Sequence, residues 1–122
     1  MAAIKRFEDI EAWQRARELV REVYKMCAEG RPSRDFNLQG QLCRAAVSCM
    51  SNSAEGFSRN GDKDFAHFLD IAKGSALEIQ SLLYVALDLG YVEKSGFERL
   101  YELTDRVASL IGGLILYLRK RS

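Results

Sequence analysis

Apolar residues recur three and four positions apart in four segments of the chain, the spacing that places side chains on one face of an α-helix. This periodicity predicts helices over about 9–28, 38–57, 63–89 and 96–118. The segments between them are short and rich in residues typical of turns. No segment alternates apolar and polar residues as a half-buried strand would. The pattern therefore predicts an all-α fold, an antiparallel up-and-down four-helix bundle that occupies residues 1–122 as one domain.

Residues that favour helix N-termini stand near the start of each predicted helix, because their side-chain oxygens accept hydrogen bonds from free backbone N–H groups. The predicted caps are Asp9, Asn37, Asp62 and Ser95, the last in a Ser-x-x-Glu capping box. Gly74 lies inside the third helix, where glycine costs about 1 kcal/mol relative to alanine. A neighbouring helix packed closely against its backbone would offset that cost, so we expect a close contact at Gly74.

The core faces follow from the same periodicity. On the first helix the predicted core face consists of Ile10, Trp13, Ala16, Val20, Val23, Tyr24 and Cys27. On the fourth helix almost no polar residue interrupts the segment 110–118. A helix that is apolar on all sides has to be covered on all sides, so we expect this segment to contact other copies of the chain. The predicted interface residues are Leu110, Leu114, Ile115, Leu116 and Tyr117.

Composition restricts the class of protein. Hydrophobic residues make up 48% and charged residues 29% of the chain, as in an ordinary globular domain. The net charge is +1, which is not the strongly basic balance of a dedicated nucleic-acid coat. Cys27, Cys43 and Cys49 are odd in number and lie in helical apolar patterns, which favours reduced thiols. With no apolar signal core near the N-terminus and no run long enough to cross a bilayer, we expect a cytoplasmic protein without membrane contact.

A narrow polar stripe runs along the second helix. At 100° per residue it comprises Gln41, Arg44, Ser48, Asn52, Glu55 and Arg59, and Glu78 of the third helix is positioned to join it. Such a stripe either forms a structural hydrogen-bond seam between helices or faces a polar ligand. The spacing alone fits both interpretations.

Basic residues on the first helix form the best nucleic-acid candidate. Arg17, Arg21 and Lys25 follow Gln14 on one side, and each can reach a phosphate. An acidic stripe of Glu11, Glu18 and Glu22 lies alongside, so a solvated face of mixed charge is the alternative interpretation. Two terminal clusters have no acidic neighbour in the sequence and are either nucleic-acid-binding arms or solubilising ends: Lys5 with Arg6, and Arg119, Lys120 and Arg121.

An enzyme is difficult to assemble from this sequence. His67 is the one histidine, and Asp64 and Asp70 lie three residues on either side of it, which is at most a weak divalent-metal site. The cysteines have no neighbouring base in any recognisable pattern. We therefore expect no catalytic residues and no cofactor, and we keep a metal-dependent enzyme as the least favoured hypothesis.

Four motifs together carry a family resemblance. They are Phe7-x-x-Ile10-x-x-Trp13-Gln14-x-Ala16, Gln41-x-x-Arg44-Ala45-Ala46-x-Ser48, Asn52-x-Ala54-Glu55-Gly56-x-x-Arg59 and Phe68-Leu69-x-Ile71-Ala72-x-Gly74-Ser75-x-x-Glu78. In combination the chain resembles the bacterial ribosomal-RNA intervening-sequence proteins over nearly its whole length. The resemblance implies four-helix subunits assembled into a ring, a homopentamer. The related accessory variability determinant proteins of diversity-generating retroelements bind nucleic acid and a reverse transcriptase on a basic surface.

Two main hypotheses follow. The first is a non-enzymatic oligomeric scaffold that binds RNA, DNA or a nucleic-acid enzyme such as a reverse transcriptase through basic patches. The second is a self-assembling protein-interaction module that does not bind nucleic acid. Both predict that the chain associates with itself.

Overall fold

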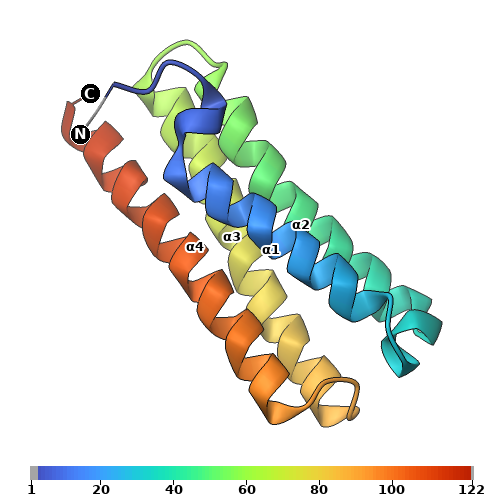
Figure 1. The fold of residues 1–122 in the computed structure, drawn as a ribbon. Coiled ribbons are helices and arrows are strands. Elements are labelled where there is room, and N and C mark those ends of the chain that lie inside the picture. The colour runs from blue at the N-terminus through green and yellow to red at the C-terminus, as the bar shows by residue number, and fades with distance from the viewer. Residues whose placement is uncertain (1–2, 122) are drawn as a thin grey trace.

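The computed structural model describes residues 3–121, and every regular element in that range is helical. Four α-helices form the domain: α1 (Glu11–Cys27), α2 (Phe36–Phe57), α3 (Asp62–Asp88) and α4 (Lys94–Arg121). Two short 3₁₀ helices, η1 (Phe7–Asp9) and η2 (Arg31–Arg34), precede α1 and α2. Successive helices run in opposite directions and pack on one another, and α4 also contacts α1 (Figure 1). The predicted all-α four-helix fold is confirmed.

Side chains from all four helices meet in one continuous core. Leu19, Leu42, Ile79 and Ile111 are each at most 1% exposed and represent the four helices in it. The prediction for α1 was wrong at one position, because Tyr24 is 50% exposed. The buried arc of α1 is centred on Ala12, Ala16, Leu19 and Val23, and Tyr24 lies outside that arc on the surface.

The cap of α2 is Asp35, two residues before the predicted Asn37. The Oδ1 atom of Asp35 accepts a hydrogen bond from the backbone N–H of Leu38 at 3.1 Å. Its other carboxylate oxygen accepts the Tyr91 hydroxyl at 2.9 Å, so one side chain both starts α2 and holds the α3–α4 link.

The other three predicted caps are also wrong. Asp9 lies in η1, where its carboxylate accepts the backbone N–H groups of residues 5 and 6. Asp62 and Ser95 lie inside the first turns of α3 and α4. The link between α3 and α4 therefore ends earlier than the Ser-x-x-Glu motif indicates, and α4 begins at Lys94.

The close helix contact occurs at Gly56, and the expectation for Gly74 was wrong. A Cβ on Gly56 would lie 2.9 Å from Phe65 Cδ1 and 2.9 Å from Phe68 Cβ, so α2 approaches α3 closely there. Gly74 is exposed, and a Cβ there would meet nothing within 4 Å. Glycine at position 74 therefore has no packing reason within one chain.

The C-terminal half of α4 is covered by its own chain more completely than its composition predicts. Leu114 and Ile115, two predicted interface residues, are buried in the intramolecular core, and Leu110 is partly buried against it. Leu116 remains 61% exposed and Tyr117 37% exposed. None of the helices in the described part of the chain is both long enough and apolar enough to cross a bilayer.

Two glycine substitutions test this packing. Gly56→Ala places a Cβ against Phe65 and Phe68, and we expect a loss of about 1–3 kcal/mol in the free energy of unfolding. Gly74→Ala is the matched control: it adds a Cβ in open space within a helix, and we expect a gain of up to about 1 kcal/mol. Urea unfolding followed by circular dichroism measures both. Equal effects of the two substitutions would contradict the assignment of Gly56 as the contact.

Candidate nucleic-acid interface

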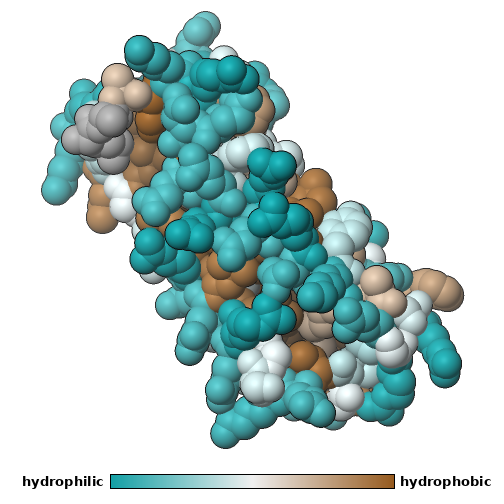
Figure 2. All heavy atoms as spheres, viewed as in Figure 1, coloured by the Kyte–Doolittle hydropathy of each residue, from teal (hydrophilic) through white to brown (hydrophobic). Residues whose placement is uncertain are grey.

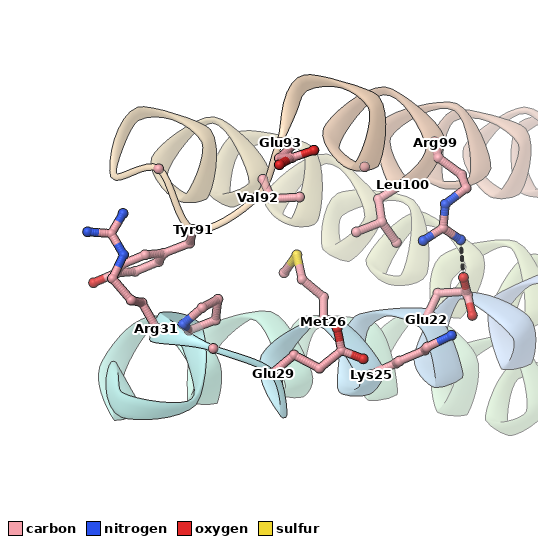
Figure 3. A pocket seen from close by; sticks show the side chains of 14 residues that line it. Glu22, Lys25, Met26, Glu29, Arg31, Tyr91, Val92, Glu93, Arg99 and Leu100 are labelled. Carbon is pink, nitrogen blue, oxygen red and sulfur yellow. Dashed lines mark hydrogen bonds and ion pairs between the residues drawn. The ribbon is translucent and has the colours of Figure 1, made fainter.

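All three acidic residues of the predicted acidic stripe on α1 are paired. Glu22 accepts a hydrogen bond from Arg99, which reaches across from α4 (Figure 3). The other two ion pairs are Glu18–Arg15 at 3.0 Å and Glu11–Arg106 at 3.6 Å. The bond from Arg99 is the main reason that the pKa of Glu22 lies below its ordinary value, with smaller contributions from the charges of Arg99, Lys25 and Arg21. The acidic stripe is thus largely neutralised by arginines of α4 and of α1 itself.

The three basic residues beside it keep their charges available. Arg17, Arg21 and Lys25 are exposed, and within the described residues none of them forms an ion pair with a carboxylate. The guanidinium of Arg17 lies over the ring of Trp13, 5.9 Å from its centroid, which fixes its direction. The residues are four apart, so they are spaced about 6 Å apart along the helix axis. They form a row of positive charges parallel to α1.

Helix α2 continues this surface without adding free negative charge. Its one acidic residue, Glu55, is bonded to Arg59 at 2.7 Å, while Arg44 is exposed and forms no hydrogen bond or ion pair within the described chain. A shallow hollow of about 600 Å³ lies between α1 and α2. Its lining has no acidic residue and consists of Tyr24, Gly40, Cys43, Arg44, Val47, Ser48, Ser51 and Asn52.

One part of the predicted polar stripe forms a seam between α2 and α3. The hydroxyl oxygens of Ser48 and Ser75 are 2.9 Å apart. The Nδ2 group of Asn52 donates to the Ser48 carbonyl at 2.9 Å and to its Oγ at 3.0 Å. This part-buried network joins the two helices, and it holds Ser48 and Asn52 at the edge of the hollow.

The rest of the stripe does not join that seam. Arg59 pairs with Glu55 and lies over the ring of Phe68, 4.7 Å from its centroid. Glu78 is exposed and has no hydrogen bond or ion pair with Glu55 or Arg59 in the described structure. The predicted stripe is therefore two separate sets of contacts. Arg44 and Glu78 lie outside both, and Gln41 donates to Asn37 Oδ1 at 3.2 Å instead.

We define the α1–α2 surface as Arg17, Arg21, Lys25, Arg44 and the adjacent hollow. The chain that carries this surface is similar to known proteins. The sequence profile of the 23S rRNA-intervening sequence protein family matches residues 8–113, which include α1, α2, α3 and most of α4. The chain belongs to this family. The resemblance noted from the four motifs is thereby confirmed.

A solved structure shares the fold of this intervening-sequence protein. It is a protein with unknown function from the S23 ribosomal protein family of Bacteroides thetaiotaomicron. The TM-score is 0.78 at 20% sequence identity, and the alignment covers 85% of this chain and 97% of the other. At that identity the likeness concerns the fold alone. No curated protein matches the chain.

The C-terminal basic cluster of this intervening-sequence protein is not a separate arm. Arg119, Lys120 and Arg121 belong to α4. Arg119 pairs with Asp70 at 2.6 Å and Arg121 with Asp62 at 2.7 Å. Both carboxylates belong to α3, which runs antiparallel to α4. They are far from the arginines in the sequence, so the sequence alone did not indicate these ion pairs. Arg6 of the N-terminal cluster pairs with Glu8 at 2.6 Å.

The residues proposed for metal or thiol chemistry are poorly placed for it. Asp70 is bonded to Arg119, and no three histidine, cysteine, aspartate or glutamate residues within 3–121 are grouped closely enough to hold a metal ion. Burial raises the pKa of the Cys27 and Cys49 thiols to about 12, so both remain protonated near neutral pH.

A second hollow, at the end of the bundle, has a less suitable charge. It has a volume of about 540 Å³ and lies where the link after α1 meets the link between α3 and α4 (Figure 3). Arg31 crosses it to donate to the Leu89 carbonyl at 2.7 Å. Three acidic residues line it as well as three basic ones, so it is less suited to phosphate than the α1–α2 surface. These are Glu22, Glu29 and Glu93, and Lys25, Arg31 and Arg99.

Exposed apolar side chains are concentrated on the outer face of α3. The residues that form this α3 outer face are Ile71, Leu77, Tyr84, Val85 and Leu89, all more than 40% exposed. Further hydrophobic residues are visible in the strip between α1 and α4 (Figure 2). Of the eleven large hydrophobic residues that are exposed in the described chain, the α3 outer face holds five, and α4 contributes Leu116 and Tyr117.

The paired state of Glu22 has a pH signature. Folding lowers its pKa, so the pair stabilises the folded chain above the ordinary carboxyl pKa, and that contribution is lost as the pH falls through the lowered value. We expect Glu22→Gln to be less stable than the parent by about 0.5 kcal/mol at pH 7, because the pair is partly exposed, and we expect this deficit to shrink as the pH falls through the lowered pKa of Glu22. Urea unfolding at a series of decreasing pH values measures the difference. A deficit that does not change with pH would indicate lost packing instead of lost charge.

Proposed function

We propose that this intervening-sequence protein is a non-enzymatic scaffold that binds RNA or DNA through its α1–α2 surface. The supporting observation is the separation of charge on α1: the carboxylates are paired, whereas Arg17, Arg21 and Lys25 have no acidic partner within the described residues. Phosphate groups bind such exposed basic side chains and release condensed counterions as they do so. The family name, which refers to 23S rRNA, is consistent with this ligand.

The size of the patch sets the strength of binding. Four basic side chains neutralise few phosphates, so one subunit binds weakly and the affinity falls steeply with salt. In a ring of subunits the patch is repeated, and simultaneous contacts with one strand raise the apparent affinity without further residues. The C-terminal basic residues contribute less to this binding, because two of the three already pair with carboxylates of α3. These residues are Arg119, Lys120 and Arg121. A nucleic-acid enzyme such as a reverse transcriptase is a further partner for the same charges.

Charge reversal on α1 tests the proposal. We expect Arg17→Glu with Arg21→Glu to weaken binding of a labelled RNA or DNA at least about ten-fold at low salt and to reduce the salt dependence. The control is Lys73→Glu with Lys94→Glu, which makes the same change in net charge on α3 and α4, and we expect little effect. Fluorescence anisotropy across a salt series measures both. Absence of binding by the parent chain even at low salt would rule out the function.

A second function is favoured by the α3 outer face. Five exposed apolar side chains, four on α3 and Leu89 at its C-terminal end, form a surface suited to contact between copies of the chain, and Leu116 of α4 is exposed as well. On this basis the protein is a self-assembling module, a ring-like homo-oligomer and, by family resemblance, a homopentamer. Self-assembly is compatible with nucleic-acid binding, and it is also a function by itself if no nucleic acid binds.

Light scattering with matched substitutions tests the assembly. We expect the parent chain to have a mass several times 13.8 kDa at micromolar concentration. Leu77→Glu with Val85→Glu places two charges on the α3 outer face, and we expect a shift toward the monomer. Phe36→Glu changes a 77% exposed ring at the start of α2, outside that face, and we expect the parent mass. A monomeric parent would exclude the ring.

A further inference from the structure

We infer that the nucleic acid bound by the α1–α2 surface is single-stranded, and that one of its bases stacks on Tyr24 in the hollow between α1 and α2. The inference rests on the proposed function and specifies the kind of ligand. It follows from three features: an exposed aromatic ring in the hollow, unused hydrogen-bonding groups in its lining, and the row of basic residues on α1 that continues next to the ring.

Tyr24 differs from the other tyrosines of the chain. All five lie in the described residues, and the other four have specific contacts. Tyr84 and Tyr101 pack against Phe97, Tyr91 donates to Asp35, and the hydroxyl of Tyr117 accepts from Arg121. Tyr24 has no ring, cation or hydrogen-bond partner in the described chain, and it is 50% exposed in the lining of the hollow. A half-exposed ring on a rigid helix is a ready platform for a stacked base.

The hollow also offers unused polar groups. Arg44 has no hydrogen-bond or ion-pair partner within 3–121, so its N–H donors are available. It lies across Gly40: a Cβ on that glycine would be 3.0 Å from Arg44 Nη1. The Nδ2 group of Asn52 is bonded to Ser48, which leaves the Oδ1 acceptor without a partner in the described structure. The hollow therefore combines an aromatic ring with a free donor and a free acceptor, the groups that stacking and edge recognition of an unpaired base require.

Basic residues beside Tyr24 place phosphates near the hollow. Arg21 and Lys25 lie one helical turn apart on the solvent side of α1, and Tyr24 immediately precedes Lys25. A strand that follows this row of charges brings its bases toward α2, where the hollow is lined by small side chains and no acid. Bases in a duplex are stacked and paired, so they cannot lie on the ring, and only the phosphate contacts remain. The surface therefore favours an unpaired strand over a duplex.

Substitution of the ring separates stacking from charge. The probes are a labelled 15-nucleotide single strand, in RNA and DNA forms, and a duplex of the same length. We expect Tyr24→Ala to weaken single-strand binding by about ten-fold, the scale of one base–aromatic stack, and to change duplex binding by less than about two-fold. Tyr24→Phe keeps the ring and should retain the parent affinity. Phe36→Ala removes an exposed ring outside the hollow and should have no effect, with circular dichroism confirming that each variant is folded.

The outcomes distinguish this inference from the proposed function. If Arg17→Glu with Arg21→Glu weakens binding but Tyr24→Ala does not, the function holds and the stacking site is overturned. If Tyr24→Ala weakens single strand and duplex equally, the site is likewise overturned. If the parent binds neither probe at low salt, both the function and the site fail. Selective loss on the single strand, with retention by Tyr24→Phe, supports the inference.

Discussion

The close approach of α2 to α3 at Gly56 is the contact on which the surface arrangement depends. With no Cβ at that position, the ring of Phe65 and the Cβ of Phe68 lie against the backbone of α2. The same approach brings Ser48 and Ser75 within hydrogen-bonding distance about two turns away along the helices. These contacts fix the rotation of α2 about its axis. The rotation decides which residues of α2 reach solvent beside α1, including Arg44.

Charge on the surface is organised by pairing between helices. Arg99 and Arg106 of α4 pair with carboxylates of α1, and Asp62 and Asp70 of α3 pair with arginines at the end of α4. Within the described residues, α1 and α2 carry four basic side chains without an ion pair and no unpaired carboxylate, whereas α3 and α4 carry unpaired residues of both signs. Exposed pairs contribute little to stability. Their effect here is on where a polyanion can bind.

Periodicity predicted the four helices and most of the core, because one buried arc per helix is a local property of the sequence. It also placed Arg17, Arg21 and Lys25 on one side of α1. It could not predict that Arg119 and Arg121 would pair with α3, since those carboxylates lie 49 and 59 residues away. Tyr24 was misassigned for a related reason: it lies at helical spacing from core residues, and only the position of α2 shows it to be exposed. The predicted caps were wrong because several polar residues of similar propensity stand near each helix start. The geometry of the turn, as at Asp35, decides which of them caps the helix.

The two ends of the described chain lie at the same end of the bundle (Figure 1), and Ala3 and Arg121 line one cavity there. A short linker can therefore join them while leaving the helices in register, and the chain can be reopened at an exposed turn such as Ser58–Gly61. Such a circular permutant would make α3 the first helix and α2 the last. The architecture is in this sense a closed cycle of four helices, because each helix packs on the next and α4 packs on α1.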